Sequence, residues 1–154
     1  MKIRNASAAD LDDLWVLNQQ ITEYHHTQAP AVFAAPGEEA KEFMHQALLD
    51  DNRTFLVCEQ HARVIAFLSA VIDRNQSNPF IVSDPICRIG TIVVDQQHRS
   101  AGIGRLLINA CEQWAQSQGA IDIRLEVMEF NQRALSFYHA LGFDTLSRIM
   151  VKSL

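Results

Sequence analysis

Apolar residues recur at helical spacing in four stretches of the chain, and this periodicity predicts four helices. The first follows Ser7–Asp10, a sequence typical of a helix cap, and the second begins at Glu38, where a helix start favours negative charge. The third is predicted for about 102–117. The fourth is short, begins after Asn131 and ends at Gly142.

Stretches rich in β-forming residues predict six strands, and the connections between them predict how they pair. The predicted strands are 2–5, 54–59, 64–73, 87–95, 121–129 and 145–154. A tight polar turn joins the second strand to the third, which predicts an antiparallel hairpin. A helix separates the fourth from the fifth, which predicts a parallel pair. The expected fold is therefore α/β, with a mixed sheet and helices on both faces.

The composition narrows the class of protein. A length of 154 residues suits a single domain, 1–154. No apolar run reaches the ~18 residues of a membrane-spanning helix, and the N-terminus lacks a signal-peptide pattern. Three cysteines without short spacing indicate neither a disulfide framework nor a zinc site. We therefore expect a cytoplasmic protein with no metal site and no membrane partner.

Charge is distributed unevenly along the chain. Residues 1–60 hold 10 acidic and 4 basic side chains, whereas residues 61–154 hold 8 and 9. The net charge of −5 argues against a nucleic-acid partner, which would need a basic face. An anionic ligand is better placed beside the later residues, and a cationic ligand beside the earlier ones.

The turn after the strand at 87–95 is a candidate phosphate site. Amide groups at a helix start are unpaired and carry partial positive charge. Gly102 and Gly104 keep side chains away from the main chain there, and Arg99 and Arg105 add cations. A plain strand–helix turn with two glycines has the same spacing, so the pattern alone leaves both interpretations open.

Two other phosphate-binding turns fit this segment less well. A Walker loop is absent from the sequence. The dinucleotide turn needs a third glycine where Leu107 stands, although Asp122 or Glu126 lies at the distance of its acidic residue. A nucleotide-binding module therefore remains an alternative.

The segment Arg99-x-x-Gly102-x-Gly104, between a strand and an amphipathic helix, resembles motif A of the GNAT superfamily of N-acetyltransferases. The downstream residues resemble motif B of that family: Leu125–Val127, Asn131, Ala134, Phe137, Tyr138 and Leu141–Phe143. Together the two motifs span about 89–143. The resemblance implies a GNAT-like fold with a mostly antiparallel central sheet and one splayed parallel pair.

In this family, acetyl-CoA lies in a V-shaped gap between the two splayed strands, which here end at Val94 and Val127. The resemblance implies that the backbone of Ile92–Val94 pairs with the pantetheine arm and that amides from Arg99 to Gly104 hold the pyrophosphate. Ser100 stands where the family pattern has glycine. The implied cofactor-binding residues are Ile92, Val93, Val94, Arg99, Ser100, Ala101, Gly102, Ile103, Gly104, Arg105, Asn131 and Tyr138.

The resemblance also implies catalytic roles. Tyr138 matches the family's general acid, which returns a proton to the departing thiolate; on spacing alone it is a buried aromatic residue. Glu126 precedes it by twelve residues, the spacing of the acid and base in amino-terminal acetyltransferases. Glu126 is therefore the candidate base, or else a polar residue of a half-exposed strand. The chain has no acidic residue between Cys87 and Val94, where many family members carry one.

Histidines and ordered water are the other candidates for the base. His25 and His26 lie in the loop Tyr24–Gly37, where the family's substrate loop sits, whereas His98 and His139 are expected to be turn and helix-surface residues.

The resulting hypothesis is an acetyl-CoA-dependent N-acetyltransferase that acts on a primary amine by direct attack in a ternary complex. The acceptor is a small molecule or a protein N-terminus, and its determinants lie in Tyr24–Gly37 and Arg74–Pro85. The alternative is a non-catalytic CoA- or nucleotide-binding module. Because family members often pair, a homodimer is a further expectation.

Overall fold

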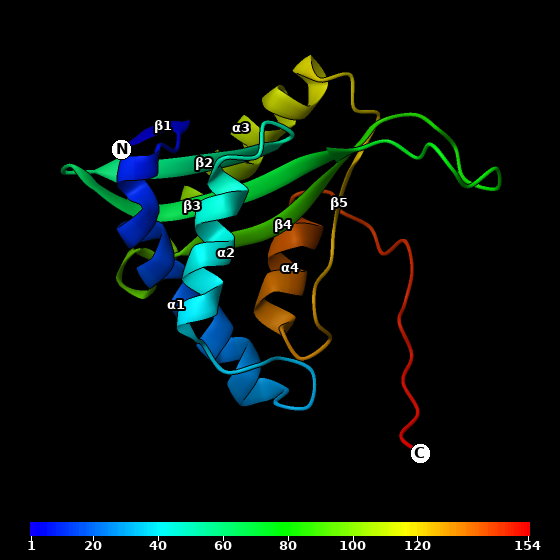
Figure 1. Cartoon of the computed structure of the whole chain (residues 1–154), viewed down its shortest axis with the longest axis horizontal. Helices are drawn as coiled ribbons and strands as arrows, with labels where there is room; N and C mark the ends of the chain where they lie inside the picture. Colours follow the sequence, from blue (N-terminus) through cyan, green and yellow to red (C-terminus); the bar gives the residue numbers. More distant parts are fainter.

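The computed structural model describes residues 1–154 and contains one five-stranded sheet in the order β1-β2-β3-β4-β5 (Figure 1). Its strands are β1 (Lys2–Asn5), β2 (Arg53–Gln60), β3 (Arg63–Asp73), β4 (Ile86–Val94) and β5 (Ile123–Leu125). The first four pair antiparallel, and β4 pairs parallel with β5. The predicted hairpin and the predicted parallel pair are both confirmed.

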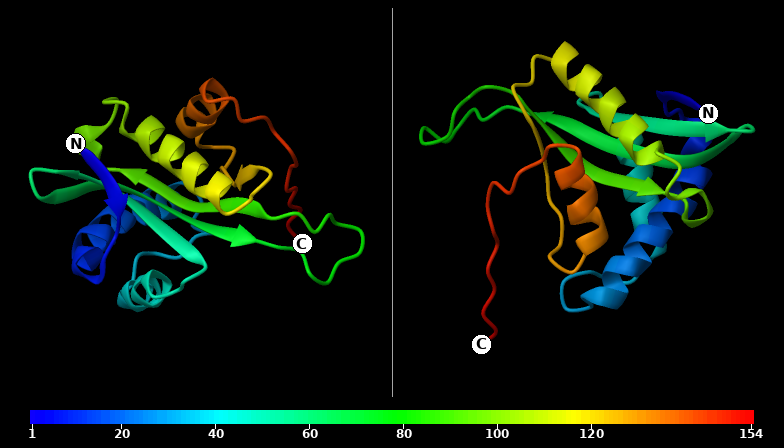
Figure 2. Two further views of the ribbon diagram at one scale, coloured as in Figure 1. Left: turned by 90° about the horizontal axis from the view of Figure 1, so that it is seen from above. Right: turned by 180° about the vertical axis from the view of Figure 1, so that it is seen from behind.

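Helices cover both faces of the sheet, as predicted (Figure 2). They are α1 (Leu11–Gln28), α2 (Glu38–Leu48), α3 (Ile103–Ser117) and α4 (Gln132–Ala140). The first two lie on one face and the last two on the other. None of these helices combines the length and the apolar character needed to cross a membrane.

A hydrophobic core lies on each side of the sheet. On the α3 side, Leu107 and Cys111 pack with Leu68 of β3, and all three are fully buried. On the α1 side, Leu14 packs with Phe67, the neighbour of Leu68 in β3. Successive side chains of a strand point to opposite faces, so the continuous apolar run in β3 serves both cores.

Two elements differ in length from the prediction. Helix α1 runs to Gln28, into the segment expected to be a loop from Tyr24. The strand predicted for 121–129 is reduced to Ile123–Leu125, because its pairing with β4 ends at Leu125. Beyond that point the chain leaves the sheet.

The prediction of a last strand at Thr145–Leu154 is wrong. The segment has no regular structure, is exposed throughout, and extends away from the fold (Figure 1). Its β-forming residues have no partner, since nothing pairs with the outer edge of β5 and a strand needs hydrogen bonds from a neighbour. The segment leaves Leu146, Ile149, Met150, Val151 and Leu154 in solvent.

Asp10 ties the first strand to the first helix, and its removal is expected to destabilise the fold. Two nitrogens of Arg4 donate to its carboxylate at 2.8 Å, and these bonds lower the pKa of Asp10 from 3.8 to about 2. A lowered pKa means that the carboxylate stabilises the fold above pH 3.8 and that this contribution disappears as pH falls through about 2. Asp10→Asn is expected to lower the free energy of unfolding at pH 7 by about 2 kcal/mol in urea titrations.

The matched control is Asp12→Asn. Asp12 pairs with Lys41 at 2.8 Å, but its side chain is 86% exposed, so solvent screens the pair. We expect little change in stability from this variant. Equal losses in the two variants would contradict a special role for Asp10.

Candidate functional site

The parallel strands β4 and β5 separate after a short paired region. Their last matched residues are Ile89 and Leu125. Strand β4 continues to Val94 and stays paired with β3 on its other side, so its edge facing β5 has no strand partner from Gly90 onward. Gly90 is skipped in the register with β3, which marks a bulge where the strands diverge. The result is the V-shaped gap that the family resemblance implies.

The turn after β4 presents bare backbone at the start of α3. Gly102 is the N-cap of α3 with φ of +77°, and a Cβ added there would meet nothing within 4 Å. The first hydrogen bond of the helix runs from the amide of Leu106 to the carbonyl of Gly102. The amides of residues 103–105 come before this first bond, have no partner within the helix and remain available to an acceptor outside it. This geometry suits a diphosphate.

Ser100 adopts the left-handed conformation that its family position allots to glycine. Its φ is +69°, in the left-handed region, where residues other than glycine are strained. Its hydroxyl oxygen accepts a hydrogen bond from Arg133 of α4 at 3.3 Å. The departure from the family pattern thus keeps the backbone shape and adds a link to α4.

Gly104 allows close packing between two helices. A Cβ on Gly104 would lie 3.0 Å from the ring of Phe137, so α4 rests directly on the first turn of α3. The neighbouring cations have different surroundings: Arg99 Nε donates to the carbonyl of Val94 at 3.2 Å, and Arg105 is exposed. Ala101 is also exposed, whereas Ile103 is buried in the core.

The apolar residues of β4 beside the gap face both sides of the sheet. Ile92 and Val94 pack against the core on the α3 side, and Val93 is buried on the α1 side. Their backbone therefore remains at the unpaired edge while their side chains anchor the strand.

Asn131 and Tyr138 lie at the two ends of α4. The Asn131 side chain accepts a hydrogen bond from the amide of Ala134 at 3.2 Å and caps the helix. The ring of Tyr138 is partly buried against the core on the α3 side, next to Phe143 at a centroid distance of 5.7 Å. Burial raises the pKa of Tyr138 to about 12. Its phenol is therefore protonated at neutral pH and can donate.

Glu126 directly follows the last residue of β5. That residue, Leu125, packs against the core on the α3 side. Glu126 is exposed, one residue beyond the last pair of β4 and β5 and therefore at the start of the gap.

The histidines of the α1–α2 region join an aromatic cluster that the sequence did not predict. The His25 ring stacks on Phe33 at 4.7 Å and lies 5.8 Å from Phe130, which also contacts Tyr24. Burial lowers the pKa of His25. His26 forms a hydrogen bond with the carbonyl of Phe33 at 2.8 Å. This cluster fastens the loop after α1 to the segment before α4.

The other two histidines have local roles. His98 contacts Asp95 at 3.2 Å within its turn, and His139 contacts the carbonyl of Phe143 at 2.9 Å at the end of α4. Both positions fit the expectation of a turn residue and a helix-surface residue.

Comparison with known proteins decides the family. The model of the acetyltransferase (GNAT) family matches residues 18–143. The chain belongs to the GNAT family. The resemblance inferred from the two motifs is therefore confirmed, and the family is one of acetyl-transferring enzymes.

Three relatives illustrate the match. An uncharacterized N-acetyltransferase of Methanocaldococcus jannaschii is 28% identical over 146 residues, which cover 92% of this chain and 60% of the relative. A mutant Bacillus halodurans protein has a crystal structure with a TM-score of 0.93 and 26% identity, covering 100% of this chain and 99% of its own. The acetyltransferase AAC(6')-Iy, bound to a CoA bisubstrate analogue, shares the GNAT fold at a TM-score of 0.79 and 19% identity, covering 99% and 97% of the two chains.

The chain spans less than two thirds of the length of the curated relatives that it matches first. The structural neighbours, in contrast, are matched over nearly their whole length. The chain therefore shares the fold of these neighbours over nearly its whole length.

Proposed function

We propose that the chain is a single-domain, acetyl-CoA-dependent N-acetyltransferase that moves an acetyl group to a primary amine. The observation that carries the proposal is the divergence of β4 and β5 after Ile89 and Leu125, beside the bare backbone at the start of α3. A GNAT neighbour of the same fold holds a CoA bisubstrate analogue. The acceptor is a small-molecule amine or a protein N-terminus.

The residues of the gap fit acetyl-CoA. The unpaired edge of β4 from Gly90 to Val94 offers hydrogen bonds to the pantetheine amides. The amides of 103–105 and the open surface at Gly102 suit the pyrophosphate, and Arg99 and Arg105 add positive charge.

Acetyl-CoA supplies an acetyl group activated as a thioester. The amine nitrogen forms a bond to the acetyl carbon as the carbon–sulfur bond breaks. Glu126 accepts the proton that the ammonium form of the acceptor must lose, directly or through water. Tyr138 donates a proton to the departing sulfur, which its raised pKa of about 12 permits at neutral pH, and it regains a proton from the nitrogen as the amide forms.

Direct transfer fits the positions of the cysteines. Cys87 and Cys111 are buried in the core on the α3 side, with their sulfur atoms 3.8 Å apart, and Cys58 is buried in β2. None of these thiols is exposed to receive the acetyl group. Three free thiols also support the proposed cytoplasmic location.

Thiol release in the presence of a panel of primary amines tests this function. We expect acetyl-CoA to be consumed faster when an acceptor is present, with the acetylated amine detected by mass spectrometry. A thermal-shift comparison of acetyl-CoA with NAD addresses the alternatives. Stabilisation by acetyl-CoA without turnover of any amine would favour a non-catalytic CoA module, and stabilisation by NAD alone would favour a nucleotide-binding module.

Glu126→Gln tests the base. If Glu126 accepts the proton, this variant is expected to remove or displace the rise of activity with pH. If it only attracts the ammonium group, the KM of the acceptor should rise while the pH profile stays unchanged. Glu129→Gln, at an exposed residue of the same segment, is the matched control. If neither parameter moves in Glu126→Gln, the base must be sought among His25, His26 and water.

We also propose that the chain forms a homodimer through its C-terminal residues 145–154. This exposed segment carries apolar side chains together with Arg148 and Lys152. A groove of about 380 Å³ runs beside the free edge of β5 and has Glu112 and Asp144 in its wall. A second copy of the segment would match that groove in both polarity and charge.

Light scattering tests the proposed dimer. It is expected to show a dimer for the full chain and a monomer after deletion of residues 145–154. A monomeric full chain would contradict the proposal.

A further inference from the structure

The sheet face on the α1 side carries a row of polar side chains near the gap. Cys87, Ile89 and Leu125 point to the α3 side, so their neighbours in β4 and β5 point to the α1 side. By the same alternation, β2 and β3 contribute residues an even number of positions away from Phe55 and Phe67. The polar strand residues of this face near the gap are Arg53, Ser69, Asp73, Arg88, Thr91 and Arg124.

Arg53 stands apart from the other arginines of this face because it has no partner. Arg88 Nε donates to Asp73 at 2.7 Å, and Arg124 donates to Asp122 at 3.0 Å. The Nε of Arg53 is buried and donates to no acceptor. A buried donor without an acceptor is costly, and more so in a charged group. The structure thus holds a guanidinium group that lacks an anion.

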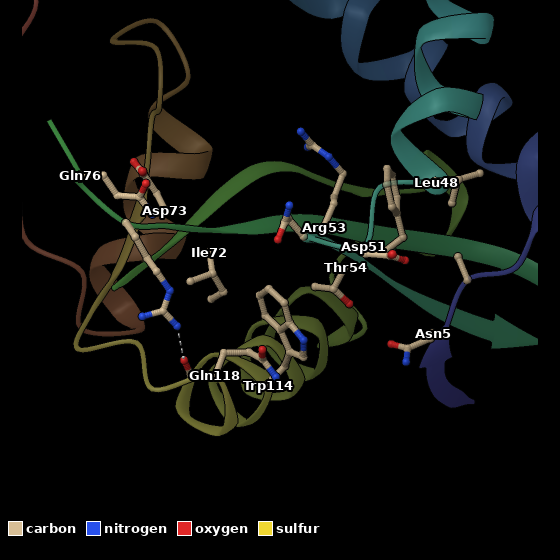
Figure 3. A pocket seen from close by; sticks show the side chains of 14 residues that line it. Asn5, Leu48, Asp51, Arg53, Thr54, Ile72, Asp73, Gln76, Trp114 and Gln118 are labelled. Carbon is tan, nitrogen blue, oxygen red and sulfur yellow. Dashed lines mark hydrogen bonds between the residues drawn. The ribbon is translucent and has the colours of Figure 1, made fainter. Parts of the chain in front are cut away.

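The guanidinium of Arg53 reaches the point where the gap opens. Its Nη1 lies 3.8 Å from the position that a Cβ on Gly90 would occupy, so the side chain crosses β3 to reach the bulge of β4. Ser69 Oγ lies 3.5 Å from the same position. Figure 3 shows the Arg53 side chain rising from β2 on the side away from Trp114 and α3. Arg53 is also one of the residues that line a cleft of about 780 Å³ next to Trp114 and Gln118.

Arg53 and the proposed base Glu126 carry opposite charges near the point where β4 and β5 begin to diverge. Glu126 follows Leu125, whose partner in β4 is Ile89, the residue before Gly90. Neighbouring strands are ~4.8 Å apart, so the paired residue Leu125 lies about one strand spacing from the part of β4 that Arg53 reaches. A small molecule that carries an ammonium group and a carboxylate a few bonds apart has the two charges needed to bind both Glu126 and Arg53.

We propose that Arg53 binds a carboxylate of the acceptor, so that the acceptor is an amino acid whose amine lies beside Glu126. A guanidinium binds a carboxylate through two parallel hydrogen bonds, which fixes orientation as well as position. The Ser69 hydroxyl is placed to donate a third bond to the same group. The inference rests on the proposed N-acetyltransferase function, whose acceptor it specifies.

Matched acceptor pairs test the inference. Each pair is a free amino acid and its carboxamide, which differ in the carboxylate and keep the amine. With the wild-type enzyme, we expect kcat/KM to be at least about tenfold higher for the acid, since a hydrogen-bonded charge pair is worth that much. Arg53→Met is expected to lower kcat/KM for the acids by ~10–100-fold and to leave the amides within about twofold. The KM of acetyl-CoA should stay unchanged.

Arg63→Met is the control, because it removes the same charge at an exposed position at the start of β3. A wild-type enzyme without preference for the acids, or an equal loss for both members of a pair in Arg53→Met, would overturn the inference. Short peptides with a free carboxylate form a second arm; a preference for them over free amino acids would also overturn it.

A binding measurement separates this inference from the proposed function. Calorimetry with CoA and N-acetyl amino acids, or their amides, requires no turnover. Binding of the acids to the wild type, with loss in Arg53→Met, would support the carboxylate site even if no amine released thiol and the proposed function failed. Turnover of amines without any effect of the carboxylate would uphold the function and reject the site.

Discussion

Tyr138→Phe is expected to lower kcat by ~10²–10⁴-fold, the usual contribution of a general acid. The change removes one oxygen and leaves the ring, which packs against Phe143 and the core on the α3 side. Burial raises the pKa of Tyr138 to about 12, so the phenol stays protonated throughout the pH range of the assay. Steady-state kinetics at saturating acetyl-CoA and acceptor measure the effect, and the affinity for acetyl-CoA should stay nearly unchanged.

The chain's other tyrosine provides the control. Tyr24→Phe removes a hydroxyl from an exposed ring in the segment Tyr24–Gly37, which is expected to contact the acceptor, so it should affect the KM of the acceptor and leave kcat at saturating acceptor nearly unchanged. Wild-type turnover in Tyr138→Phe would assign Tyr138 to the core alone. If Tyr138→Phe also lowers the thermal stability of the protein strongly, the loss of kcat would be explained by lost packing and not by lost proton transfer.

Much of the fold follows from local patterns in the sequence. The helical periodicity after Asp10 and after Gly102 and the hairpin between β2 and β3 all depend on residues close together in the chain. Pairing partners depend on distant residues, and here prediction was weaker. The alternation from 121 to 129 predicted a long strand, but the parallel partner of β5 diverges after Ile89. The segment 145–154 has the composition of a strand and no partner within its own chain.

The candidate site divides in the same way. The turn at Arg99–Gly104 and the residues of α4 form short motifs, so the order of amino acids alone is enough to indicate them. Arg53 lies 37 residues before Gly90, and only the register of three strands brings its guanidinium over the bulge. The contact of His25 with Phe130 likewise joins two segments with no shared pattern. Such contacts have no local signal in one sequence.

Gly102→Val is expected to weaken acetyl-CoA binding by at least ~100-fold, through the loss of charge-assisted hydrogen bonds from the start of α3. The residue is the N-cap of α3, and its φ of +77° strains any side chain. A Cβ there would meet no protein atom within 4 Å, so the valine would project into the open space proposed for the pyrophosphate. Calorimetry or thermal shift with acetyl-CoA measures the loss.

Gly119→Val separates the effect on the ligand from the strain. Gly119 follows the other end of α3 with a φ of +75°, and a Cβ there would also meet nothing within 4 Å. The two variants therefore carry the same backbone strain, ~1–2 kcal/mol, and should lose similar stability in urea titrations. Only Gly102→Val should lose acetyl-CoA. If a folded Gly102→Val protein binds acetyl-CoA as the wild type does, or if both variants lose it equally, the pyrophosphate does not lie at the start of α3.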